Sequence, residues 1–125
     1  MATQRQLRVN NLLKQEIALI LQRDIEDPLI GFATITDVEV SADLRHAKVF
    51  VSVLGDQESK QNTIRGLVRG RKFIRGLLGD RIALRTVPQL TFHLDETAEQ
   101  ALRIETLLRE TAEEDGDPNE ADVLE

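Results

Sequence analysis

The sequence contains no cysteine, no tryptophan and no tyrosine among its 125 residues. Without cysteine the chain can form no disulfide bond, no thiol nucleophile and no cysteine-based zinc site. No apolar run approaches the roughly 18–20 residues that a membrane-spanning helix requires. The N-terminal stretch MATQRQLRVNN also lacks the apolar core of a signal peptide. We therefore expect a cytoplasmic protein with no membrane association.

Groups that could perform catalysis are also scarce. Neither of the two histidines, His46 and His93, has an evident orienting partner, and the chain has no Walker-type GxxxxGK[ST] motif or dinucleotide fingerprint. Asp24, Glu26 and Asp27 form an acidic cluster that resembles a magnesium site, but a solvated helix end explains it more simply. The sequence therefore predicts a protein that is not an enzyme and that holds no metal ion or cofactor.

The formal net charge of −6 is unevenly distributed. Residues 110–125 contain eight acidic residues and no basic one, and without them 16 basic and 14 of the 22 acidic residues remain. Low apolar content and high charge are typical of disorder. We therefore expect a mildly basic folded domain over residues 1–109 and an acidic disordered tail over residues 110–125. The tail either keeps the protein soluble or competes with a polyanionic ligand.

Apolar periodicity predicts the first three elements. Three- and four-residue spacing indicates a helix over residues 7–26, which Pro28 would end. Residues 34–40 are rich in β-branched side chains, which favour strands. Residues 47–54 place apolar side chains at alternate positions, which also indicates a strand. The polar residues 41–45 between them have the length of a hairpin loop, so the two strands should pair antiparallel.

Helical spacing returns over residues 57–79, where Gly70 is expected to break the segment into two short helices. Gly79 would end the second helix in left-handed geometry. A third strand over residues 89–94 and a last helix from about Thr97, whose first residues have capping-box spacing, complete the chain. The order α-β-β-α-α-β-α predicts an α+β fold with a three-stranded sheet.

Residues 65–85 concentrate positive charge, with Asp80 as their single acid. Helical geometry places Arg65, Arg69 and Lys72 on one side, with Arg75 adjoining, while the apolar residues turn inward. Phosphate backbones supply the counter-charge that such a face lacks, although neighbouring acids would also do so on an ordinary solvated helix. The cations of this segment are Arg65, Arg69, Arg71, Lys72, Arg75, Arg81 and Arg85. The residues expected to turn inward are Ile64, Leu67, Val68, Ile74 and Leu78.

Aromatic residues restrict how nucleic acid could be recognised. The four phenylalanines, Phe32, Phe50, Phe73 and Phe92, are expected in the core, which leaves few groups for base stacking. Recognition should therefore use phosphates, 2′-hydroxyls and shape. The element order suggests a KH-type fold, but its usual GxxG clamp is absent, because the GLLG of residues 76–79 has core-type leucines at a helix end.

Two segments carry a resemblance to a known family: SADLRHAKVFVSVLG at residues 41–55 and KFIRGLLGDRIALRTVPQLTFHLDET at residues 72–97. Over residues 3–109 the chain resembles the ribosome-binding factor A family of bacterial small-subunit assembly factors. The resemblance implies a type II KH-like domain in which an interrupted helix with small residues replaces GxxG. Gly70 occupies the first small position, whereas Lys72 departs from the pattern at the second.

The resemblance further implies a monomeric, non-catalytic factor that binds the immature 30S subunit through 16S rRNA. Such a factor aids late maturation, including 5′-end processing, works alongside assembly GTPases and is associated with growth in the cold. Arg45 either extends the RNA-binding surface or orders the hairpin by pairing with Asp43. A general KH-like regulator of messenger RNA and a protein–protein adaptor remain alternative functions. Besides the cations of residues 65–85, the expected RNA contacts are Arg5, Arg8, Lys14 and Arg45.

Overall fold

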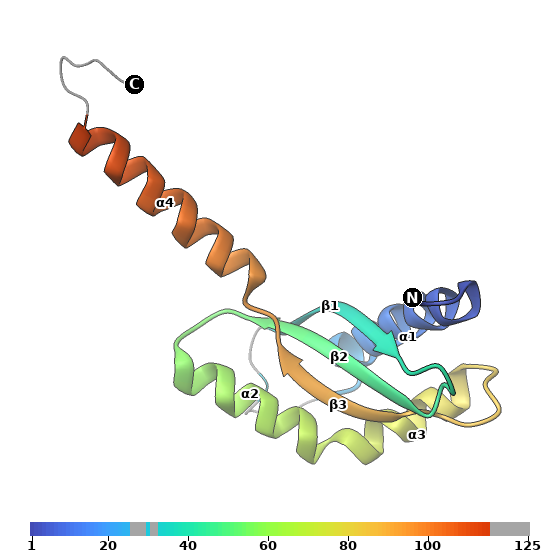
Figure 1. Ribbon diagram of the computed structural model, residues 1–125. Helices are drawn as coiled ribbons and strands as arrows, with labels where there is room; N and C mark the ends of the chain where they lie inside the picture. The colour runs from blue at the N-terminus through green and yellow to red at the C-terminus, as the bar shows by residue number, and fades with distance from the viewer. Residues whose placement is uncertain (26–29, 31–32, 116–125) are drawn as a thin grey trace. The chain divides into compact units, whose positions relative to one another are not determined.

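The computed structural model describes residues 1–25, 30 and 33–115 (Figure 1). Its elements are α1 (Gln4–Arg23), β1 (Ala33–Val40), β2 (His46–Val53), α2 (Gln57–Arg69), α3 (Arg71–Arg81), β3 (Gln89–Leu94) and α4 (Thr97–Asp115). The predicted order of helices and strands is confirmed. The chain divides into two compact units, Met1–Asp95 and Glu96–Glu125.

The three strands form one mixed sheet in the order β1-β2-β3. β1 and β2 pair antiparallel, as expected for a hairpin, with an irregularity in register between Ile35 and Asp37. β2 and β3 pair parallel, with Val49 opposite Phe92. Parallel neighbours need a long crossover, and α2 and α3 supply it. The α2–α3 pair is therefore tied at both ends to adjacent strands.

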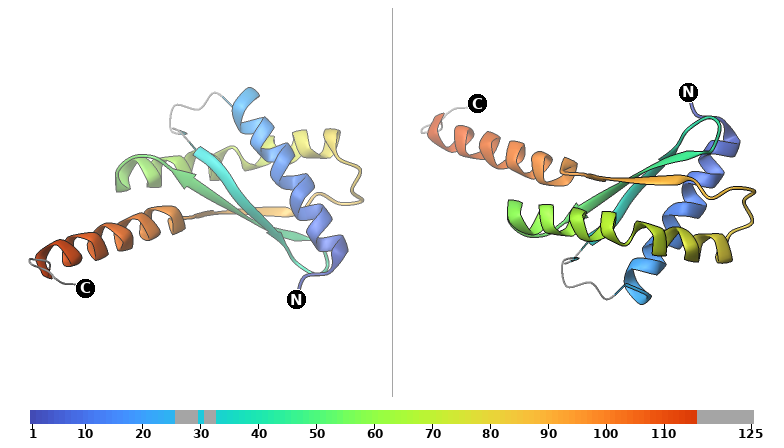
Figure 2. Two further views of the ribbon diagram at one scale, coloured as in Figure 1. Left: turned by 90° about the horizontal axis from the view of Figure 1, so that it is seen from above. Right: turned by 90° about the horizontal axis from the view of Figure 1, so that it is seen from below.

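The core lies between one face of the sheet and the first three helices. Alternate residues of β2, such as Val49 and Val51, are fully buried together with Leu13 from α1, Leu67 from α2 and Ile74 from α3. Figure 2 shows α1 crossing the strands, with α2 and α3 following one another along the molecule. Because the other residues of β2 are exposed or half-buried, the opposite face of the sheet is open within residues 1–95.

Helix α1 begins three residues earlier than its apolar spacing predicts. Thr3 caps it, since the Thr3 hydroxyl oxygen accepts the N–H of Gln6 at 3.1 Å and the Gln6 side chain accepts the N–H of Thr3 at 2.8 Å. This reciprocal pair is a capping box. The helix ends at Arg23 rather than at residue 26, and the predicted stop at Pro28 lies outside the described residues.

The prediction that Gly79 ends a helix in left-handed geometry is wrong. α3 continues to Arg81, and Ile82 closes it with an extended backbone while its N–H still donates to the carbonyl of Leu78. Gly55 is the only glycine with a positive φ among the described residues. The helical hydrogen bonding of α3 therefore passes through Gly79.

Helix α4 runs to Asp115 and so includes residues 110–115, which the charge pattern places in the acidic tail. Residues 116–125 lie outside the described part, and their disorder stays a prediction. Four large apolar side chains of α4 are solvent-exposed in this unit: Leu102, Ile104, Leu107 and Leu108.

Candidate nucleic-acid interface

The predicted helix break lies between α2 and α3. Gly70 is the residue that separates them, with φ −87° and ψ 5°, a conformation open to any residue. Its N–H still donates to the carbonyl of Gly66 at 2.9 Å, and its carbonyl accepts the N–H of Ile74. A Cβ at this position would lie 3.4 Å from the Gly66 carbonyl oxygen. The break is thus a single residue wide, and the cations on either side remain close along the chain.

Three of the predicted contacts form what we call the cationic ridge, namely Arg65 and Arg69 on α2 and Lys72 on α3. All three side chains are exposed. Among the described residues, no carboxylate pairs with Arg65 or Lys72. The inward face of these helices holds Leu67 and Ile74, both fully buried, together with the buried polar residues Lys60 and Thr63. The ridge therefore presents positive charge to solvent from a rigidly packed support.

Arg71 and Arg75 are placed differently from the ridge. Both are half-buried, and their guanidinium groups donate to backbone carbonyls at the start of β3. Arg75 Nε reaches the carbonyl of Pro88 at 3.0 Å and Nη2 that of Val87 at 2.9 Å, while Arg71 Nη1 reaches that of Leu90 at 3.4 Å. Charged donors to buried carbonyls stabilise a fold. Arg75 therefore joins α3 to β3, which its sequence position alone does not indicate.

Substitution of Arg75 by glutamine is expected to lower the free energy of unfolding by about 1–2 kcal/mol, because two carbonyls lose a charged donor. Thermal unfolding followed by circular dichroism measures this change as a fall of several degrees in Tm. Arg65→Gln is the matched control, since Arg65 is exposed and unpaired among the described residues, and its Tm should stay unchanged. Equal Tm values for both variants would contradict the structural role of Arg75.

Arg81 is paired with Asp24, which follows α1. The two groups are 2.8 Å apart and about one-third exposed, so this ion pair links the ends of α1 and α3. The pairing also accounts for one member of the acidic cluster that resembled a magnesium site. The other two members, Glu26 and Asp27, lie outside the described residues. In the described part of the chain, no three ligand-type side chains are grouped as a metal site.

The other predicted contacts lie at the N-terminal end of α1 and in the loops nearby. Arg5, Arg45 and Arg85 line one cavity of about 320 Å³, which we call the arginine pocket. Arg8 and Lys14 lie farther along α1, where Arg8 is exposed and Lys14 is half-buried.

Arg45 contacts Asp43 through its backbone N–H, while its side chain makes no ion pair with that carboxylate. Asp43 accepts the backbone N–H of Arg45 at 3.0 Å and the hydroxyl of Ser41 at 2.6 Å. The Ser41 hydroxyl and then this N–H hold the pKa of the Asp43 carboxyl below its ordinary value. Among described residues the Arg45 guanidinium has no ion-pair partner. Asp43 therefore orders the hairpin through the backbone, and the Arg45 side chain is left to solvent.

Two apolar side chains near the ridge depart from their predicted burial. Phe73, expected in the core, is 52% exposed on the first turn of α3, and Val68, expected to turn inward, is 43% exposed on α2. Phe92 is buried as expected, Phe50 is half-buried, and Phe32 lies outside the described residues. The buried stripe of α2 and α3 runs through Thr63, Leu67, Ile74 and Leu78, and Val68 and Phe73 each lie one position away from it. Phe73 thus adds an exposed aromatic ring to the first turn of α3, next to Lys72 in the sequence.

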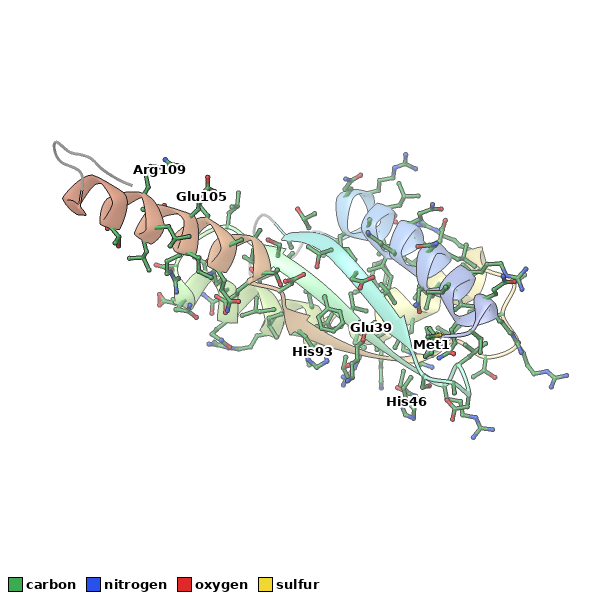
Figure 3. The ribbon with its side chains drawn as sticks, turned by 45° about the horizontal axis from the view of Figure 1, so that its top comes forward. Met1, Glu39, His46, His93, Glu105 and Arg109 are labelled. Carbon is green, nitrogen blue, oxygen red and sulfur yellow. The ribbon has the colours of Figure 1, made fainter. Side chains whose placement is uncertain are left out.

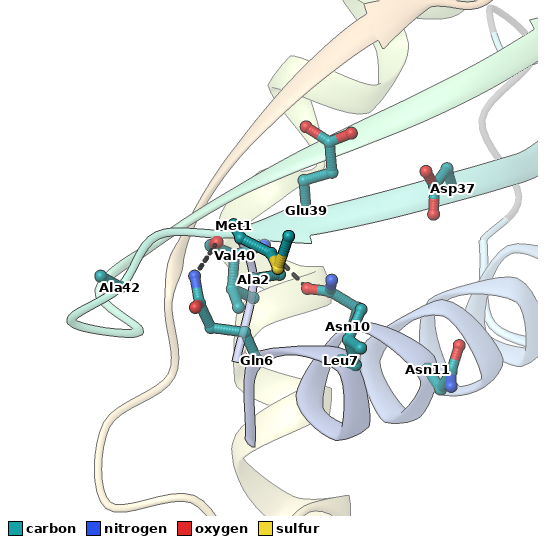
Figure 4. Close-up of a pocket in the computed structure, with 10 residues that line it drawn as sticks. All are labelled: Met1, Ala2, Gln6, Leu7, Asn10, Asn11, Asp37, Glu39, Val40 and Ala42. Atoms are coloured by element: carbon teal, nitrogen blue, oxygen red, sulfur yellow. Dashed lines mark hydrogen bonds between the residues drawn. The ribbon is translucent and has the colours of Figure 1, made fainter. Parts of the chain in front are cut away.

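A second cavity, of about 560 Å³, lies between the start of α1 and the outer edge of β1 (Figure 4). Gln6 donates to the carbonyl of Val40 at 3.2 Å, and Asn10 accepts the N–H of Val40 at 2.8 Å. These two side-chain amides satisfy the backbone hydrogen-bonding groups of Val40 at the end of β1. Asp37 and Glu39 also line the cavity, so its charge opposes the binding of a phosphate.

The two histidines lie on the open face of the sheet, His46 on β2 and His93 on β3 (Figure 3). His93 shares a hydrogen bond of 2.9 Å with Thr91 and stacks at a tilt on Phe50, with 5.6 Å between ring centroids. In register His46 pairs with Gln89 and His93 with Phe50, so the two rings are not neighbours.

Within residues 1–25, 30 and 33–115, none of the helices has the length and apolar character needed to cross a bilayer.

Known proteins match both the sequence and the architecture. The chain is 46% identical over 115 residues to ribosome-binding factor A of Halothermothrix orenii, a match that covers 92% of this chain and 94% of the relative. The crystal structure of ribosome-binding factor A from Thermus thermophilus superposes with a TM-score of 0.65 at 25% identity, covering 71% of this chain and 93% of that one.

A homology model of the Thermus thermophilus protein, fitted into the cryo-EM map of its complex with the 30S subunit, matches with a TM-score of 0.59. That match is 26% identical and covers 70% of this chain and 92% of the other. These structures have a KH-like fold, so the predicted α+β KH-like class is confirmed. The family model for ribosome-binding factor A matches residues 5–108. The chain therefore belongs to the ribosome-binding factor A family.

Proposed function

We propose that this chain binds the 30S ribosomal subunit through 16S rRNA and assists late maturation of the subunit, including processing at the 5′ end of the RNA. It acts without catalysis, as a monomer in the cytoplasm, and works alongside assembly GTPases. Membership of the family and the 30S complex of the Thermus thermophilus relative support binding to the subunit.

The observation that carries the RNA-binding part of this proposal is the cationic ridge. Arg65 and Lys72 are exposed and have no acidic partner among the described residues, so their charge is available to an external polyanion. Lysine and arginine release counterions when they contact phosphates, which supplies much of the affinity for RNA. Arg69 lies between them in the sequence and completes the ridge.

Phe73 gives this surface a second kind of contact. A cationic groove with an exposed aromatic ring is the usual arrangement for holding single-stranded nucleic acid, because bases stack on the ring while phosphates meet the cations. Phe73 follows Lys72 directly and is half exposed. The ridge together with Phe73 therefore favours an unpaired stretch of rRNA over a regular duplex.

Sedimentation of the full chain through sucrose gradients with purified immature 30S, mature 30S, 50S and 70S particles, and with isolated transcripts, tests the proposal. We expect the protein to travel with 30S particles, most strongly with immature ones. Tighter binding to isolated transcripts than to immature 30S particles would instead favour a regulator of messenger RNA. Absence from every ribosomal fraction would favour a protein–protein adaptor.

A further inference from the structure

The arginine pocket draws its lining from three separate parts of the chain. Arg5 lies in the first turn of α1, Arg45 in the loop before β2, and Arg85 in the loop before β3. The backbone N–H of Gln89 donates to the carbonyl of Arg45 at 2.8 Å, which fixes the second loop to the start of β3. Three cations distant in sequence therefore meet at one cavity of the folded domain.

The positive charge of the pocket is only partly offset from within, because Asp43 interacts electrostatically with Arg45 but three arginines line the cavity. Among described residues none of the three guanidinium groups has an ion-pair partner. Asp43 is the only acidic residue in the lining, and its Oδ1 already accepts hydrogen bonds from Ser41 and from the backbone of Arg45. Cations held near one another repel, so a bound anion would lower the energy of this arrangement.

The loop that carries Arg45 is rigid and strained. Leu44 has φ 61°, the only positive φ of a non-glycine residue in the described chain. Its N–H donates to the carbonyl of Ser41 at 2.9 Å, and its side chain packs against the core. Strain of this kind concentrates at functional sites, where surrounding contacts hold an unfavourable conformation. The position of the Arg45 backbone is thus set before any ligand arrives.

The first turn of α1 adds to the positive electrostatic potential at the arginine pocket. It contains Arg5 and no acidic residue, although the positive end of a helix dipole ordinarily favours acidic side chains. The remaining lining includes Leu44, Leu84 and the hydroxyl-bearing Thr86, and it contains no aromatic residue. The pocket therefore offers charge and hydrogen-bond donors but no aromatic ring on which a base could stack.

We propose that the arginine pocket binds one phosphate group of RNA at a site separate from the cationic ridge. Guanidinium groups suit this ligand because their paired N–H donors match two phosphate oxygens. The inference rests on the proposed RNA-binding function and adds to it a second, discrete anchor. The phosphate is either a backbone diester or the monoester at an RNA terminus, and both present the same oxygens to the three arginines.

The arginine Nε–Hε signals of the full chain, observed by NMR, report on the pocket directly. Sodium phosphate is titrated against sodium chloride at equal ionic strength, followed by a short RNA with and without a 5′-phosphate. We expect the signals of Arg5, Arg45 and Arg85 to shift together and to saturate with phosphate or RNA but not with chloride. Shifts with both RNAs identify a backbone phosphate, whereas shifts with the phosphorylated RNA alone identify a terminal one.

Arg45→Gln is the variant of choice. The Asp43 carboxylate accepts its hydrogen bond from the backbone N–H of Arg45, so the loop keeps its hydrogen bonds when the side chain is changed. We expect roughly a 3- to 10-fold loss of affinity for RNA and a fall of about 0.7–0.9 in the salt slope. Arg23→Gln, at the other end of α1, is the control for charge. Absence of saturable shifts at the three arginines with phosphate and with both RNAs would overturn the proposal. If the ridge residues prove unimportant for 30S binding, the result of the phosphate titration is unaffected. The proposals for the cationic ridge and for the arginine pocket can therefore be disproved independently.

Discussion

Simultaneous replacement of Arg65, Arg69 and Lys72 with alanine is expected to weaken binding to the 30S subunit by about 100- to 1000-fold, as three phosphate contacts are lost. The dependence of log affinity on log salt concentration should also become shallower, by about 0.7–0.9 for each contact removed. The fold should persist, because all three side chains are exposed. Filter binding to purified 30S particles at several salt concentrations measures both quantities.

A matched control separates local contacts from net charge. Arg23, Arg103 and Arg109 are exposed and are not among the residues of the proposed interface, so their triple alanine variant removes the same charge. We expect it to retain binding within a few-fold. The double variant Arg65→Ala/Lys72→Ala serves as a second test if the triple variant unfolds at a lower temperature. Equal losses for the ridge and control variants would disprove a specific ridge.

The sequence predicts the elements well because each depends on local rules. Spacing of apolar residues locates every helix and strand, and the polar loop at residues 41–45 predicts the antiparallel hairpin. The prediction fails where a local rule has an exception, as at Gly79, where glycine usually ends a helix but here continues one. Parallel pairing of β3 with β2 was not predicted, because it depends on how the α2–α3 crossover returns to the sheet.

The candidate site is less predictable, because the role of a cation depends on what lies near it in space. Arg65 and Arg75 look alike in the sequence, yet Arg65 is exposed, whereas Arg75 is half-buried and donates to carbonyls of residues 87 and 88. Arg81 similarly meets Asp24, a residue 57 positions away. No pattern in residues 65–85 identifies these partners. Convergence of Arg5, Arg45 and Arg85 likewise requires the assembled sheet, since each is contributed by a different segment.

The charged contacts and the aromatic contact of the proposed interface predict different responses to salt and to RNA structure. A phosphate pocket and a cationic ridge both lose affinity as salt rises, because each acts through counterion release. An aromatic contact does not, since stacking involves no net charge. Phe73 is the residue through which the interface can distinguish unpaired RNA from duplex, and its removal should therefore leave the salt slope unchanged.

Phe73→Ala is expected to reduce affinity for single-stranded rRNA segments by about 10- to 100-fold, the loss of one stacked base. Phe73→Trp should retain binding, because the ring face is preserved. Leu54→Ala is the control for removing an exposed apolar side chain, as Leu54 is 74% exposed between β2 and α2. Fluorescence anisotropy with labelled single-stranded and duplex RNA measures the effect, which should be confined to the single strand. An equal loss on both RNAs, or none on either, would show that Phe73 stacks on no base and that the ridge binds through phosphates alone.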